Sequence, residues 1–91
     1  MSDSRSFDFK PRARGMIIGG IPWLARISDK ARARMADRIG AYVYPCAADM
    51  RFLEEVQLSA DEFTAFVAEC RDDGALIAKM KAHLTAKGLD K

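Results

Sequence analysis

Apolar side chains recur at intervals of three or four positions in four stretches of the chain, the pattern of helices that bury one face. These stretches predict helices over residues 23–39, 48–56, 59–70 and 72–87. Gly40 and Gly88 are expected to end the first and the last helix, because glycine readily adopts the left-handed conformation found there. Ser59 followed by Glu62 predicts a capping box at the start of the third helix.

Three segments break this helical period. Residues 1–15 are expected to form an irregular N-terminal arm, because Pro11 and Gly15 interrupt a polar stretch. Phe7 and Phe9 are expected to pin this arm to the body of the protein. The stretch MIIGGIPWL predicts a turn that leads into the first helix, and AYVYP predicts a loop with extended backbone before its proline.

The fold class indicated by these elements is all-α, a compact bundle of four or five short helices with one irregular or extended Tyr-rich loop. Residues 16–88 are expected to form a single helical domain. One residue conflicts with the pattern of the first helix: Arg38 falls inside its apolar arc. Its side chain must either reach solvent or meet an acceptor.

Composition agrees with a small soluble domain. The chain has 91 residues, of which 49% are hydrophobic and 31% charged. No apolar run approaches the roughly 20 residues that span a bilayer, and the N-terminal segment lacks the apolar core of a leader peptide. Cys46 and Cys70 are too few for a disulfide scaffold. We therefore expect a cytoplasmic protein with free thiols and no membrane partner.

The net charge of +2 is unevenly distributed along the chain. Residues 1–51 carry ten Lys and Arg against five Asp and Glu, whereas residues 52–91 carry five against eight. The basic half favours an anionic ligand, or the two halves could attract each other or a second copy in a homo-oligomer. The basic blocks are short and lack an aromatic platform, which argues against a nucleic-acid partner.

The segment WLARISDKARARM followed by GAYVYPCAADMRF resembles a small bacterial family catalogued as a domain of unknown function, DUF5069. Its members carry Trp-Leu-x-Arg, Asp-Lys-Ala-Arg and Gly-x-Tyr-x-Tyr-x-Cys-x-x-Asp-x-Arg. The resemblance covers about residues 15–80 and matches Trp23, Arg26, Asp29, Lys30, Arg32, Gly40, Tyr42, Tyr44, Cys46, Asp49 and Arg51. The chain departs from the family pattern at Ala25, Pro45 and Ala47-Ala48. The resemblance implies no activity.

The same residues suggest a small pocket between the first helix and the Tyr-rich loop. The candidate ligand-binding residues are Trp23, Arg26, Lys30, Tyr42, Tyr44, Asp49 and Arg51. Trp23 would form the floor, and the arginines would pair with a carboxylate of the ligand. The candidate catalytic groups are Cys46, which precedes a helix start, and Asp29. Alternatively, these residues are ordinary core, surface ion pairs and a locked turn.

Three functions remain open on this basis. The first is a domain that binds an anionic small molecule or a partner segment in the pocket. The second is a cofactor-independent enzyme using Cys46 or Asp29, and the third is a homo-oligomeric interaction protein that shares a Phe63/Phe66 face between copies. No metal or cofactor is expected, because the Cys and His spacing does not fit zinc and GMIIGG lacks the ending of a phosphate loop. The single histidine, His83, is expected on a solvated face.

Overall fold

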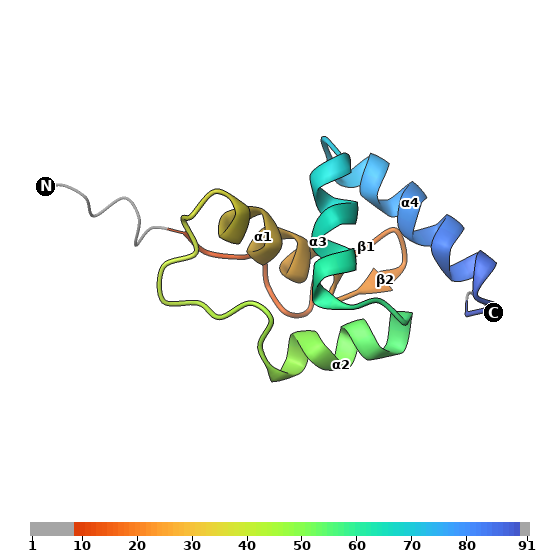
Figure 1. Ribbon diagram of the computed structural model, residues 1–91, viewed down its shortest axis with the longest axis horizontal. Coiled ribbons are helices and arrows are strands. Elements are labelled where there is room, and N and C mark those ends of the chain that lie inside the picture. Colours follow the sequence, from red (N-terminus) through yellow and green to blue (C-terminus); the bar gives the residue numbers. More distant parts are fainter. Residues whose placement is uncertain (1–8, 90–91) are drawn as a thin grey trace, which may run out of the picture.

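The computed structural model of the chain describes residues 9–89 (Figure 1). These residues begin with a two-stranded antiparallel sheet, β1 (Ile17–Ile18) and β2 (Ile21–Pro22). The helices that follow are α1 (Leu24–Met35), α2 (Ala47–Val56), α3 (Ala60–Glu69) and α4 (Asp73–Ala86). The protein is therefore mostly helical, and the small sheet is an addition to the all-α bundle that the sequence predicts.

The sheet forms where the sequence predicts only a turn. Gly19 and Gly20 both have positive φ, 59° and 75°, as the tight turn of a short hairpin requires. The hairpin packs against α4, because a Cβ added to Gly19 would lie 2.4 Å from Cγ2 of Ile77. Glycine at position 19 is thus required by the backbone conformation and by this close approach.

Helix α1 ends at Met35 and not at residue 39, which corrects the predicted first helix. Asp37 adopts φ 58°, and the backbone N–H of Arg38 donates to the carbonyl of Ala33 at 2.8 Å. These features form a Schellman motif, which ends the helix before Gly40. Arg38 lies exposed beyond the helix. It is therefore not a charged residue on the buried face of α1, and the conflict noted in the sequence is resolved.

The other three helices lie within one residue of the predicted ranges. The predicted capping box is confirmed, since Ser59 Oγ accepts from the backbone N–H of Glu62 at 3.0 Å while Glu62 Oε1 accepts from that of Ser59 at 2.8 Å. Asp72 Oδ1 caps α4 by accepting from the backbone N–H of Ala75. Gly88, with φ 71°, ends α4 as expected.

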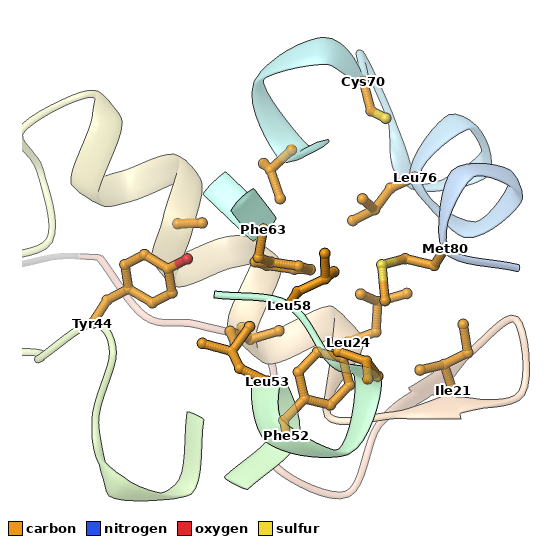
Figure 2. Packing of buried hydrophobic residues seen from close by; sticks show 14 residues of the cluster. Ile21, Leu24, Tyr44, Phe52, Leu53, Leu58, Phe63, Cys70, Leu76 and Met80 are labelled. Carbon is orange, nitrogen blue, oxygen red and sulfur yellow. The ribbon is translucent and has the colours of Figure 1, made fainter. Parts of the chain in front are cut away.

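Helix α3 lies at the centre of the fold and packs against α1, α2 and α4 (Figure 1). Its Phe63 is fully buried and faces side chains of the other helices, among them Leu24, Leu53 and Met80 (Figure 2). Phe66 is half-buried, and its ring meets the ring of His83. A Phe63/Phe66 face is therefore not available to a second copy, which corrects the surface predicted for a homo-oligomer.

The Tyr-rich loop between α1 and α2 is irregular. Tyr44 turns its ring into the core (Figure 2), and its hydroxyl lies 2.8 Å from Thr64 Oγ1. Burial raises the pKa of this phenol. Arg34 supports the loop by donating to the carbonyl of Tyr44 at 3.1 Å.

The arm is irregular over residues 9–15, and Arg12 ties it to the helices. Its guanidinium donates to both carboxylate oxygens of Asp29 at 2.9 Å and also to Asp73 at the start of α4. These hydrogen bonds lower the pKa of Asp73. Phe9 contacts Tyr42 edge to face with 5.5 Å between ring centroids, whereas Phe7 lies outside the described residues.

Candidate functional site

Asp49 is the centre of a buried polar cluster between α1 and α2. Its side chain is fully buried and accepts from Lys30 Nζ at 2.7 Å, from Trp23 Nε1 at 2.8 Å and from the backbone N–H of Cys46 at 3.0 Å. The last contact places the carboxylate at the N-terminus of α2, where the helix dipole favours negative charge. Three donors therefore satisfy a carboxylate that is shielded from water.

The charge of Asp49 survives its burial because of these donors. Burial alone would raise the pKa of the carboxyl, but the hydrogen bonds from Lys30, from the Cys46 backbone and from Trp23 outweigh it and lower the pKa. Lys30 is only 3% exposed, so the cation of the pair is also shielded from solvent. The two side chains form a buried ion pair. Removing one member of such a pair strongly destabilises the folded protein, because the other charge stays buried without a partner.

Cys46 joins this cluster through its sulfur as well as its backbone. Its Sγ accepts from Lys30 Nζ at 3.3 Å, its thiol is free, and the residue as a whole is partly exposed. The residue is the N-cap of α2. Lys30 therefore lies between the carboxylate of Asp49 and the thiol of Cys46.

Trp23 connects the buried cluster to the surface. Its backbone is in the left-handed region, with φ 73°, which is rare for a bulky side chain. The guanidinium groups of Arg14 and Arg26 lie 5.6 and 6.0 Å from its ring centroid, within range of cation–π attraction. The ring is thus held by Asp49 at its N–H and by two arginines at its face.

An open groove of about 680 Å³ begins at Trp23 and is lined by the hairpin, α2 and the C-terminal part of α4. Its apolar lining includes Ile21, Pro22, Phe52, Val56, Leu84 and Leu89. Two cations, Arg51 and Lys81, and one acid, Glu55, also line it. Within residues 9–89 neither of these cations forms an ion pair.

The predicted site residues do not all meet in one pocket. Trp23, Lys30, Cys46 and Asp49 form the buried cluster, and Trp23 and Arg51 line the groove. Tyr44 points into the core instead, and Asp29 has both carboxylate oxygens engaged by Arg12. Arg26 lies between the rings of Trp23 and Tyr42 and donates to the carbonyl of Arg12.

Sequence reasoning missed three residues of this region. Arg12 falls in the predicted irregular arm, and its two carboxylate partners are 17 and 61 positions away. Lys81 lines the groove from α4, and no local motif marks it. His83 is not simply solvated, because its Nε2 lies 2.7 Å from the carbonyl of Val56 and links α4 to the end of α2.

Two further findings bear on the kind of site. Over residues 9–89, no cluster of His, Cys, Asp and Glu has a geometry that could hold a metal ion. In the same part of the chain, every helix is too short or too polar to cross a membrane.

Comparison with known proteins identifies a family. The family model DUF5069, described as a domain of unknown function, matches residues 9–91. No curated protein matches the chain.

Proposed function

The chain belongs to the DUF5069 family of domains of unknown function, and from its groove we propose that it is a binding module for an anionic small molecule with an apolar part. The observation that carries this proposal is the groove at Trp23, which combines apolar walls with two cations, Arg51 and Lys81, that form no ion pair with any other residue of the range 9–89. Its volume of about 680 Å³ lies within the roughly 300–1,000 Å³ of ligand sites.

The charges around the groove favour an anion. Arg51 and Lys81 line it, and Arg14 lies over the ring of Trp23 without an acidic partner among the described residues. Glu55 is the single carboxylate in the lining. A ligand carboxylate would gain a charge-assisted hydrogen bond from Arg51, and its apolar part would cover Phe52 and Leu84.

The fixed position of Trp23 also supports binding at this place. A tryptophan with positive φ is strained, and such strain persists only where surrounding contacts enforce it. The hydrogen bond from Trp23 Nε1 to the buried carboxylate of Asp49 is one contact that fixes the position of this side chain. A rigid aromatic side chain loses little conformational entropy when a ligand packs on it.

The fluorescence of Trp23 tests the proposal directly, because the chain has a single tryptophan. The protein is titrated with a panel of aliphatic and aryl carboxylates and with the uncharged amide of each. We expect saturable fluorescence changes with carboxylates and at least a tenfold weaker effect with amides. Arg51→Gln should weaken carboxylate binding about 10- to 100-fold, the value of a charge-assisted hydrogen bond.

The matched control is Arg71→Gln, since Arg71 is exposed and does not line the groove. This variant should bind the carboxylates as the unmodified protein does. Equal affinities for acids and amides, or an Arg51 variant with unchanged affinity, would contradict an anion site. A response to neither series would leave no support for small-molecule binding in the groove.

Nucleophilic use of Cys46 is the second candidate function, favoured by the 3.3 Å contact of its Sγ with Lys30 Nζ. Asp29 is less suited to catalysis, because Arg12 engages both of its oxygens. The rate of Cys46 alkylation as a function of pH, in a Cys70→Ser background, tests this role. An apparent pKa near that of a free thiol would argue against it.

A homo-oligomeric interaction protein is the third candidate. Large hydrophobic side chains are exposed at Met16, Ile17, Met35, Val43 and Met50. Exposed apolar residues can mark contact surfaces, although isolated ones are normal on a monomer. Size-exclusion chromatography with light scattering tests this candidate, and a strict monomer at high concentration would remove it.

A further inference from the structure

The contact between Cys46 and Lys30 lies outside the groove proposed as a binding site, since neither residue lines it. Lys30 lies on α1, and Cys46 precedes α2, 16 residues further along the chain. Asp49 holds the Lys30 ammonium at 2.7 Å, and only 3% of the lysine side chain is exposed. An amine with so little freedom remains beside the sulfur, and Cys46 is a partly exposed residue, so we expect a small reagent to reach its thiol.

We propose that Cys46 and Lys30 form an oxidative modification site. A hydroperoxide oxidises the thiol of Cys46, and the oxidised sulfur then forms a covalent S–N bond with Nζ of Lys30. The product joins α1 to the start of α2. This inference is independent of any ligand in the groove, because it rests on the geometry of the buried cluster.

Both steps balance. In the first, Cys46–SH and H₂O₂ give Cys46–SOH and water, so the sulfur is oxidised and the peroxide is reduced. In the second, the Lys30 ammonium first passes a proton to Asp49, and the free amine then attacks the sulfur as the S–O bond breaks. The ammonium loses two protons: one leaves with the hydroxyl as water, and the other moves to the carboxylate of Asp49 at 2.7 Å. The products are Cys46–S–NH–Lys30, water and a neutral Asp49.

The structure favours this link over a disulfide. Both cysteines are free, and Cys70 is 9% exposed at the C-terminus of α3. The Lys30 amine lies 3.3 Å from the sulfur of Cys46, within reach of an oxidised thiol. Thiols would reverse the link, because a thiol attacks the sulfur, releases the amine and leaves a mixed disulfide that a second thiol reduces.

The test uses the full chain with Cys70→Ser, which removes any disulfide within one molecule. The protein is treated with hydrogen peroxide at low protein concentration, and its intact mass is measured. We expect a monomer lighter by two hydrogen atoms. Dithiothreitol should restore the original mass.

Tryptic mapping locates the link without altering Lys30. A linked Lys30 resists cleavage, so residues 27–32 should be recovered joined to residues 39–51, the peptide that contains Cys46. The double variant Lys30→Met/Asp49→Asn removes both buried charges and should instead gain only oxygen atoms at Cys46. Oxygen added to Cys46 with normal cleavage after Lys30, disulfide-linked dimers alone, or no reaction with peroxide would each overturn the proposal.

Discussion

Asparagine in place of Asp49 leaves the ammonium of Lys30 buried without its counter-charge. The aspartate is fully buried and the lysine is 3% exposed, so solvent cannot take over the role of the lost partner. Removing one member of a buried ion pair costs about 3–5 kcal/mol. A chain of this length has a total stability of roughly 5–14 kcal/mol, so Asp49→Asn should remove a large fraction of it.

A double-mutant cycle isolates the pair from its surroundings. Lys30→Met should also cost about 3 kcal/mol, because the carboxylate then keeps only the donors on Trp23 and Cys46. In Lys30→Met/Asp49→Asn no buried charge remains, and the amide oxygen still accepts from Trp23. The double variant should therefore be more stable than the sum of the single changes predicts, by at least about 2 kcal/mol.

Urea unfolding followed by circular dichroism measures these free energies. A loss of about 4 kcal/mol corresponds to a fall in Tm of roughly 16–32 °C for a domain of this size. The control is Glu69→Gln, which removes an exposed ion pair with Lys79 at 2.9 Å and should cost less than about 1 kcal/mol. Additive effects of Lys30→Met and Asp49→Asn, or a cost for Asp49→Asn no larger than that of the control, would refute the reasoning.

The same pair should make the protein acid-sensitive. The pKa of Asp49 is lowered in the folded state, although burial opposes the effect of its donors. The unfolded chain therefore takes up this proton first, near pH 4. The stability that Asp49 contributes is complete above that pH and is lost as the pH falls through its folded pKa. Lys30→Met/Asp49→Asn should show a flatter decline in stability over this acid range.

Further predictions concern the hairpin, the arm and the core tyrosine, with urea unfolding as the common assay. Gly19→Ala should cost about 2–4 kcal/mol, because it combines positive φ with a clash against Ile77, whereas Gly20→Ala meets nothing within 4 Å and should cost only about 1–2 kcal/mol; equal costs would argue against the packing of the hairpin on α4. Arg12→Gln should cost about 2 kcal/mol, and less in high salt because the guanidinium is 30% exposed; no loss at low salt would mean that the arm is not held by this contact. Tyr44→Phe should cost about 1 kcal/mol at neutral pH. Since burial raises the pKa of Tyr44, its stabilising contribution should decline as the pH rises above about 10 in the unmodified protein only.

Local signals in the sequence predicted the later helices well. The Ser59/Glu62 capping box and Gly88 mark ends that the structure confirms, because caps act within one turn of backbone. The predicted end of the first helix was wrong, because Asp37 adopts the left-handed conformation that glycine usually supplies at a helix end. The hairpin was missed because each of its strands has only two residues, too few for a recognisable alternation.

The candidate site was predicted only in part. The position of Cys46 at a helix start follows from the sequence, whereas the choice of Lys30 as the partner of Asp49 came only from the structure. The role of Arg12 could not be read locally, because it depends on the approach of α4 to α1. The inward orientation of Tyr44 likewise depends on the packing of the irregular loop against α3.

The amino-acid sequence by itself determined the helical class, most helix ends and a larger candidate set of polar and aromatic residues that includes Trp23, Lys30, Cys46 and Asp49. Periodicity and capping are local properties of the chain, so they can be read without coordinates. Only the tertiary structure decided which of these groups are buried together and which face a groove. Burial and pairing depend on segments far apart in the sequence, and they set whether a charge is solvated, paired or free to meet a ligand.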